Sequence, residues 1–219
     1  MDEGRQETNL VNKSSDYYSN LNLNVLGCIK GNDNIILDIG CGYGLLGKAL
    51  RKSKKAKFIV GVEINPNAAA VARENLDEVL CLNIENACLN YESHFDYIIL
   101  SHVLEHFYDP LNVLITLKKT LKNTGKIIVG LPNIRYWKIL RDLILFDEWI
   151  YREAGILDYD HKRFFTYSSA TELLCKAQYK IVHRWLVVGG PKKKIANVLT
   201  GKMLKSFLSP EFYIVGSKE

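Results

Sequence analysis

Short aliphatic runs alternate along this chain with longer stretches in which apolar residues return every third or fourth position. A run that is apolar on both faces is typical of a strand buried in a parallel sheet, and the longer spacing is typical of a helix with one apolar face. The alternation predicts an α/β fold. The expected strands cover 35–39, 58–64, 79–84, 95–100, 126–131, 181–188 and 211–216, and the expected helices cover 17–30, 45–52, 66–76, 110–122 and a stretch opened by a Ser169-x-x-Glu172 capping box.

A glycine-rich turn follows the first expected strand. Asp38 lies near the end of the expected strand. Gly40, Gly42 and Gly44 follow at every second position, and a helix is expected from Leu45. Glycine lets the backbone turn sharply and approach a ligand closely, and the first N–H groups of the helix point back into the turn. This strand–turn–helix unit predicts a cofactor site at the carboxyl end of the strand.

Two cofactors could bind this turn. Gly42, Gly44 and Gly47 match the spacing of a dinucleotide-binding turn, and Glu63 follows at a suitable distance for a ribose. Asp38, however, would repel the pyrophosphate of a dinucleotide. S-adenosylmethionine carries an ammonium and a sulfonium group and no phosphate, so a nearby carboxylate favours it. The charge of the turn therefore favours S-adenosylmethionine over NAD(P).

The chain resembles the class I S-adenosylmethionine-dependent methyltransferases. The resemblance rests on LDIGCGYG, VEI, FDYIIL and HVLEH at 37–44, 62–64, 95–100 and 102–106. Two further motifs, LPN at 131–133 and HKRFFT at 161–166, resemble the small-molecule branch related to ubiquinone-type O-methyltransferases and to methyltransferases of glycan assembly. The resemblance implies a Rossmann-like three-layer sandwich with a seven-stranded sheet in the order 3-2-1-4-5-7-6, in which strand 7 is antiparallel.

The resemblance also implies how the cofactor is held. Glu63, at the carboxyl end of the second strand, is expected to accept hydrogen bonds from ribose hydroxyls. Asn83 and Ile84 are expected to bind adenine through the amide oxygen and the aliphatic side chain. Tyr18 is expected over the cofactor, although an aromatic residue there could equally pack a helix onto the sheet. The expected cofactor-binding residues are Tyr18, Asp38, Gly40, Cys41, Gly42, Gly44, Glu63, Ile64, Asn83, Ile84 and Ser101.

The turn after the fourth strand contains His102, Glu105 and His106, and the resemblance places it beside the transferable methyl group. His106 could take a proton from an acceptor hydroxyl, because the pKa of histidine lies near neutrality; it could also be a wall of the site. His161 is a second candidate base. Glu105 could orient the turn or bind a divalent ion, and we expect a structural hydrogen bond, so no metal ligand is predicted. The spacing of His102, Glu105 and His106 also matches an inverted zinc-protease motif. That motif needs a long helix, whereas here a strand ends immediately before it, so a protease is not expected.

The stretch at 134–160 is an addition to the minimal fold and is rich in aromatic residues and arginine. We expect a helix and a loop inserted after the fifth strand, which cover the active site as a lid and set specificity. The aromatic residues could also serve only to hold this lid. The residues expected to contact the acceptor are His102, Asn133, Arg135, Tyr136, Trp137 and Arg163.

Composition adds few limits. The 219 residues suit a single domain, expected at 17–219 after a flexible lead at 1–16. The net charge of +5 does not require nucleic acid, and the lysines at 192–194 are expected to be solvated. No run suits a signal peptide or a membrane span, and five cysteines without CxxC spacing are typical of a reduced protein. We expect a cytoplasmic monomer or homodimer.

These features predict an enzyme that transfers the methyl group of S-adenosylmethionine and releases S-adenosylhomocysteine. The expected acceptor is a hydroxyl, less often an amine, of a small metabolite or a sugar-containing molecule. A nucleic acid is not expected, since the fourth strand is not followed by the Pro-Pro-aromatic turn of nucleobase methyltransferases. An NAD(P)-binding oxidoreductase and a non-catalytic cofactor-binding module remain alternatives.

Overall fold

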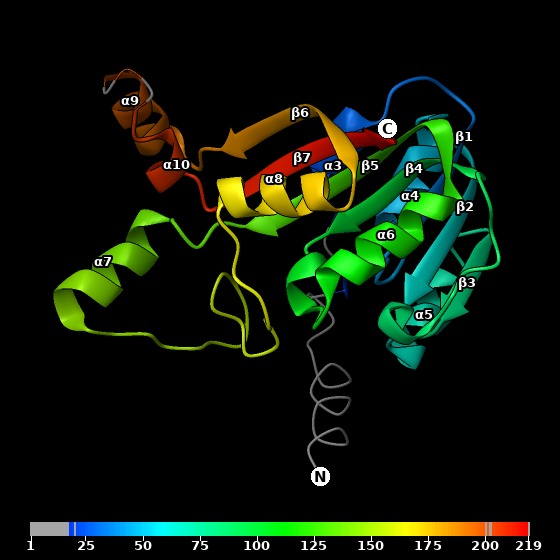
Figure 1. The fold of residues 1–219 in the computed structure, drawn as a ribbon, viewed down its shortest axis with the longest axis horizontal. Coiled ribbons are helices and arrows are strands. Elements are labelled where there is room, and N and C mark those ends of the chain that lie inside the picture. The colour runs from blue at the N-terminus through cyan, green and yellow to red at the C-terminus, as the bar shows by residue number, and fades with distance from the viewer. Residues whose placement is uncertain (1–17, 20, 200, 202, 219) are drawn as a thin grey trace, which may run out of the picture.

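The computed structural model describes residues 18, 19, 21–199, 201 and 203–218 (Figure 1). The lead expected at 1–16 and the start of the first expected helix at residue 17 lie outside the described residues. The side chains of Lys192 and Lys193 also lie outside them, whereas Lys194 is described and exposed, as expected.

The described residues form one seven-stranded sheet. Its strands are β1 Asn34–Ile39, β2 Ala56–Glu63, β3 Glu78–Cys81, β4 Phe95–Ser101, β5 Leu121–Pro132, β6 Tyr179–Val187 and β7 Glu211–Lys218. The order is β3-β2-β1-β4-β5-β7-β6. Strands β1 to β5 are parallel, and β7 lies antiparallel between β5 and β6. Both the order and the antiparallel strand confirm the fold class predicted from the sequence.

Helices cover both faces of the sheet (Figure 1). They are α3 Leu23–Cys28, α4 Leu45–Lys52, α5 Pro66–Ala72, α6 Pro110–Thr120, α7 Trp137–Phe146, α8 Tyr167–Lys176, α9 Pro191–Leu199 and α10 Lys205–Leu208, with 3-10 turns η1 Ile84–Asn86 and η2 Leu104–His106. Side chains of α6 and α8 pack with Leu37 and Ile39 on one face, whereas those of α3, α4 and α5 pack with Ile36 on the other. Because neighbouring residues of a strand point to opposite faces, burial on both sides explains the uninterrupted aliphatic run in β1.

Some predicted boundaries are wrong. The helix expected to reach about Leu76 ends at Ala72, and two other boundaries differ because the chain enters or leaves the sheet elsewhere. β3 ends at Cys81, and Ile84 lies in η1 rather than at the end of a strand. α6 ends at Thr120 rather than near residue 122, because Leu121 already pairs with Phe95 in the sheet. The residues around Gly125 therefore belong to β5 and do not end a helix.

The helices α3 and α8 also differ from the prediction. α3 spans 6 residues, and Asn22 caps it by accepting two backbone N–H groups. The N-cap of α8 is Thr166, whose side chain accepts from the N–H of Ser169, while the hydroxyl of Ser169 accepts from the N–H of Thr166. The capping box therefore pairs Thr166 with Ser169, and the predicted pair of Ser169 with Glu172 is wrong.

Gly47 determines how closely α4 approaches the sheet. A Cβ at this position would lie 2.2 Å from Leu76 Cδ2 and 3.3 Å from Ile59 Cδ1. We expect Gly47→Ala to lower the free energy of unfolding by about 1–3 kcal/mol, as overpacking does. Urea unfolding followed by circular dichroism measures the change.

Gly27 provides the matched control. It is exposed in α3, and no described atom lies within 4 Å of an added Cβ. Because alanine favours a helix over glycine by about 1 kcal/mol, Gly27→Ala should leave stability unchanged or raise it. Equal losses in the two variants would contradict the packing role of Gly47.

Candidate cofactor and catalytic site

The predicted cofactor site lies where β1 and β2 end. Asp38 pairs with Gly61 across these strands, which brings Asp38 and Glu63 to the same edge of the sheet. One oxygen of Glu63 accepts the backbone N–H of Gly42 at 2.9 Å, and the other accepts that of Asn65 at 2.9 Å. The two acids are 25 positions apart in the sequence. Together with the glycine turn they therefore form one cluster.

The glycine turn presents bare backbone to this cluster. Gly40 and Gly42 have φ values of +68° and +54°, which L side chains rarely adopt. A Cβ on Gly40 would lie 2.4 Å from Val103 Cγ2, and one on Gly42 would lie 2.7 Å from the carbonyl oxygen of Tyr18. The turn therefore requires glycine both for its conformation and for its close contacts.

The acids of this cluster favour a cationic ligand. Burial raises the pKa of Asp38 to about 7, and the charge of Glu63 adds to the shift. Burial also raises the pKa of Glu63, although hydrogen bonds from the N–H groups of Asn65 and Gly42 oppose this rise. A bound cation would stabilise both carboxylates, whereas a pyrophosphate would oppose their ionisation. The residues present thus fit S-adenosylmethionine better than a dinucleotide.

Tyr18 lies against the glycine turn. Its carbonyl oxygen accepts the backbone N–H of Tyr43 at 3.1 Å, and its hydroxyl accepts from Asn65 Nδ2 at 3.0 Å. The rings of Tyr18 and Tyr43 lie 5.6 Å apart. Tyr18 is therefore held beside the expected cofactor position by contacts with the turn itself.

The residues expected around the adenine differ in their surroundings. Asn83 caps η1, and its amide oxygen accepts the N–H of Glu85 at 3.0 Å, so an adenine amine would share this oxygen. Ile84 is buried in the apolar core, and Ile64 is exposed. Cys41 packs beside the turn, and burial raises the pKa of its thiol far above the ordinary value. Cys41 therefore contributes shape and backbone to the site, and its thiol is not reactive.

A polar network extends from the end of β4 to β7. Asn22 Nδ2 donates to Ser101 Oγ and to the hydroxyl of Tyr213, each at 2.8 Å, and that hydroxyl donates to Glu211 Oε2 at 3.2 Å. Glu211 also lies 3.1 Å from Nε2 of His102. Sequence reasoning missed Asn22, Glu211 and Tyr213. The antiparallel seventh strand was a usable signal, since it brings the first residue of β7 to the edge where the parallel strands end.

His102 is a cation in this network. It has a φ of +57°, and its ring lies between Glu211 and Glu105, whose Oε1 is 3.6 Å from Nδ1. Burial would lower the pKa of His102, but the two neighbouring carboxylates, Glu105 and Glu211, outweigh burial and raise it to about 10. His102 is thus protonated near neutral pH and could contact an anionic or polar acceptor, whereas it cannot be a base.

Glu105 lies fully buried between three histidines. Its Oε1 is 3.8 Å from Nε2 of His161, and neither of its carboxylate oxygens has a hydrogen-bond partner among the described residues. The structural hydrogen bond expected for this side chain is therefore not formed. Its backbone oxygen, in contrast, accepts the N–H groups of Lys162 and Arg163 at 2.9 Å and 3.0 Å. These two bonds attach the segment that carries His161 to η2, the turn after β4.

The two candidate bases meet beside Glu105. The rings of His106 and His161 lie 4.8 Å apart. Nδ1 of His106 lies 3.2 Å from the carbonyl oxygen of Asp160, and Nδ1 of His161 lies 3.0 Å from that of Ile156. Because a carbonyl only accepts, each Nδ1 carries the proton, which leaves Nε2 as the basic nitrogen of the neutral ring. Burial lowers the pKa of His106, so the neutral form dominates near pH 7.

The same three residues could also hold a metal ion. Ligand atoms of Glu105, His106 and His161 all lie within 4.8 Å of one another. One carboxylate and two imidazoles suit a divalent transition metal, and backbone acceptors on the second ring nitrogens are typical of metal-binding histidines. The sequence predicted no metal ligand at this position, and the geometry allows one.

Asn133 is held by contacts with the backbone. It is fully buried, and its Nδ2 donates to the backbone oxygens of Ser206 and Ser209 at 2.8 Å each. Its Oδ1 accepts the N–H of Arg135 at 3.1 Å. Asn133 therefore fastens the start of the lid to the segment before β7, and its polar atoms are used in these contacts; its role in binding the acceptor stays a prediction.

The other residues expected at the acceptor are held by protein contacts. Arg163 donates to the carbonyl oxygen of Tyr108, and the guanidinium of Arg135 lies 4.6 Å from the ring centre of Phe207. Tyr136 is buried. Trp137 lies beneath Arg141, and its Nε1 has no hydrogen-bond partner among the residues described.

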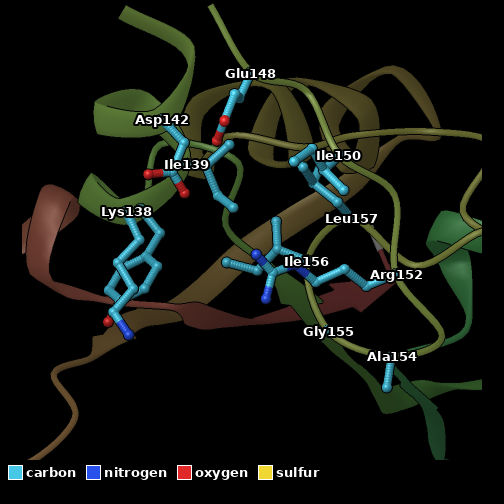
Figure 2. Close-up of a pocket in the computed structure, with 11 residues that line it drawn as sticks. Lys138, Ile139, Asp142, Glu148, Ile150, Arg152, Ala154, Gly155, Ile156 and Leu157 are labelled. Atoms are coloured by element: carbon cyan, nitrogen blue, oxygen red, sulfur yellow. The ribbon is translucent and has the colours of Figure 1, made fainter. Parts of the chain in front are cut away.

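The lid consists of α7 and a loop that returns to η2, the turn after β4. In Figure 1, α7 extends away from the sheet, and the chain after it runs back toward α6 and α8. A cavity of about 230 Å³ lies between α7 and this loop. Figure 2 shows Lys138 and Asp142 of α7 on one side of the cavity and Arg152 and Ile156 of the loop on the other. Ile156 also accepts the hydrogen bond from His161, so the returning loop links the cavity to this candidate base.

The strand order, the glycine turn and the acid at the end of β2 define a class I S-adenosylmethionine-dependent methyltransferase. A family model described as "Methyltransferase domain" matches residues 16–184. The match covers most of the chain, and the chain therefore belongs to this methyltransferase family. S-adenosylmethionine is its cofactor. This identification removes the support for the dinucleotide and non-catalytic alternatives.

Curated relatives and solved structures agree with this family. The chain is 29% identical over 161 residues to the ubiquinone biosynthesis O-methyltransferase of Cereibacter sphaeroides, covering 71% of this chain and 64% of that protein. It is 28% identical over 143 residues to the Coxiella burnetii protein of the same name, covering 63% and 59%. These matches span less than two thirds of the relatives' own length.

Solved structures show the same fold. A methyltransferase structure from Archaeoglobus fulgidus matches with a TM-score of 0.67 and 16% sequence identity, and the match covers 99% of this chain and 100% of that one. A methyltransferase structure from Mesorhizobium loti matches with a TM-score of 0.68 and 15% identity, and the match covers 94% of this chain and 100% of that one.

No helix in the described ranges combines the length and apolar character that crossing a bilayer requires.

Proposed function

We propose that this methyltransferase acts on a hydroxyl group, and less readily on an amine, of a small metabolite or a sugar-containing acceptor. The observation that carries the proposal is the pair His106 and His161 beside the buried Glu105 at the end of β4. A hydroxyl must lose a proton as it accepts a methyl group, whereas a neutral amine attacks unaided. The names of the curated relatives, which are O-methyltransferases, support the same choice.

Residues at the ends of β1 and β2 would hold the cofactor. Asp38 and Glu63 supply negative charge and hydrogen-bond acceptors, and the turn at Gly40 and Gly42 supplies bare backbone. Tyr18 would close the side of the turn that it contacts through Tyr43 and Asn65. When bound, the cofactor supplies an electrophilic methyl group on a sulfonium, so the protein chiefly has to align the acceptor with it.

The histidines would take the proton of the acceptor. The lowered pKa of His106 keeps its ring neutral near pH 7, as a general base requires. The carboxylate of Glu105, 3.8 Å from His161 Nε2, would stabilise the imidazolium that forms. His102 would remain protonated and orient a polar group of the acceptor.

A divalent cation is a second candidate for the same position, because both oxygens of Glu105 are buried without a hydrogen-bond partner in the described part of the chain. Glu105, His106 and His161 would hold the ion, which would acidify the acceptor hydroxyl. Activity that survives prolonged chelation with EDTA supports the histidines as bases. Loss of activity that Mn²⁺ or Zn²⁺ restores supports the cation, and calorimetry with Mn²⁺ on wild type and Glu105→Gln provides a readout independent of activity.

Two experiments test the proposed function. Thermal shift with S-adenosylhomocysteine and with NADH should show stabilisation by S-adenosylhomocysteine only. A labelled-methyl transfer screen should then include sugar nucleotides, lipid-linked glycans, quinones and small amines, and labelling of amines alone would overturn the hydroxyl assignment. We also propose a monomer or homodimer in the cytoplasm, which sedimentation and cell fractionation can test.

A further inference from the structure

The lid helix α7 exposes its apolar side chains. It is described in full and has no buried residue. At its C-terminal end Ile144, Leu145 and Phe146 expose 74%, 69% and 60% of their surface, and Ile150 just beyond exposes 52%. Monomeric proteins rarely leave such a contiguous apolar group in water, so it indicates a contact surface.

The arrangement of these side chains indicates what kind of contact they make. Consecutive residues of a helix point about 100° apart, and Leu143, Ile144, Leu145 and Phe146 are consecutive and all exposed. They therefore surround the end of α7. A protein groove or a second copy of the chain covers one stripe of a helix, whereas the interfacial region of a bilayer surrounds whatever enters it.

A second element has the composition of a membrane-surface helix. In α9, Ile195, Val198 and Leu199 recur at helical spacing and expose 61%, 70% and 81% of their surface. The sequence from 191 to 205 contains five lysines and no acidic residue. A basic amphipathic helix with an exposed apolar stripe is typical of binding to an anionic membrane surface.

Both elements lie at the same end of the molecule. Figure 1 shows α7, α9 and α10 together beyond the carboxyl ends of the central strands, away from β2 and β3. Asn133 binds the backbone of Ser206 and Ser209, and Arg135 lies over Phe207, so the start of the lid is joined to α10. We call residues 143–151, together with the described exposed residues of the segment 191–205, the apolar end.

We propose that the apolar end docks on the surface of an anionic lipid bilayer. The side chains around the end of α7 would enter the interfacial region, and the lysines of 191–205 would bind acidic headgroups. Trp149 and Tyr151, which follow α7 and are exposed, have the amphipathic rings that are enriched at this depth. Docking would be peripheral, because α7 has 10 residues and crossing a bilayer takes about 20. The inference does not depend on the acceptor proposed above.

Vesicle flotation tests this proposal. The full chain should float with vesicles of equal parts phosphatidylcholine and phosphatidylglycerol, and not with phosphatidylcholine alone. Each lysine near the surface contributes about fivefold in affinity, so binding should weaken steeply with added salt. The double variant Ile144→Glu, Leu145→Glu should bind at least about tenfold more weakly, because it places charge where apolar contact is needed.

A control variant and an oligomerisation assay complete the test. Ile115→Glu changes an apolar residue of α6 that is 44% exposed, and it should bind vesicles as wild type does. Thermal melts confirm that the variants fold. Failure of wild type to float with anionic vesicles, or equal flotation of the double variant, would overturn the proposal. The proposal would also be overturned if the wild type binds no vesicles and forms a dimer, and the double variant is a monomer. The apolar end would then join two copies of the chain.

Discussion

Replacing His161 with alanine is expected to lower kcat by about 10²–10⁴-fold, the usual contribution of a general base. The imidazole is 6% exposed, with its Nδ1 held by the carbonyl oxygen of Ile156 and its Nε2 3.8 Å from Glu105. Removing it leaves the acceptor hydroxyl without that proton acceptor. His106→Ala should cause a loss of the same order if the two rings share the task. The measurement is initial rate with saturating cofactor and the acceptor found in the transfer screen.

The affinity for S-adenosylhomocysteine separates a catalytic effect from a structural one. Calorimetry should give values within about threefold of wild type for both variants, because neither histidine is among the residues expected to bind the cofactor. His183→Ala is the matched control, since His183 is exposed on β6 and stacks on Trp185. Wild-type rates in both active-site variants at every pH tested would remove the proposed bases.

The sequence was sufficient for the parts of the site that depend on strand order. Asp38 and Glu63 end neighbouring strands, and once β1 and β2 pair in parallel their carboxyl ends must meet. The glycine turn was equally predictable, because few residues other than glycine adopt the positive φ values that it requires. His161 joined the site through its motif, although what holds it there is the backbone of Glu105.

The remaining interactions join residues that are distant in sequence and carry no local pattern. Asn133 binds carbonyl oxygens 73 and 76 positions later, and His102 pairs with Glu211 109 positions later. A local pattern can also be satisfied in two ways: Thr166 and Ser169 are both acceptable N-caps, and in the structure Thr166 takes this position. The unpartnered carboxylate of Glu105 was unpredictable for the opposite reason, since sequence reasoning assumes that a buried polar group finds a partner.

Cofactor affinity is expected to rise with pH through the ionisation of Asp38. Burial and the charge of Glu63 raise the pKa of this carboxyl group to about 7, above the ordinary value of about 3.9. At lower pH the unliganded site is protonated, and a cationic ligand must displace that proton to gain the carboxylate's attraction. Because a bound cation lowers the pKa, affinity increases as the pH rises through 7 and levels off above it. The linkage relation predicts a gain of about eightfold between about pH 6 and pH 7.5.

Two controls isolate Asp38 as the titrating group when the affinity for the cofactor is measured as a function of pH. Asp38→Asn keeps the shape but not the charge, so its affinity at about pH 7.5 should fall by about 10- to 100-fold, the contribution of a hydrogen bond to a charged group, and should no longer vary with pH. 5′-Methylthioadenosine lacks both the ammonium and the sulfonium group, so its binding to wild type should also be independent of pH. The range ends below pH 8 because the α-amino group of the cofactor begins to lose its own proton near there. A pH dependence that persists in Asp38→Asn would assign the titration to another group, and an affinity that falls between these pH values would contradict the stabilisation of a cation by this acid.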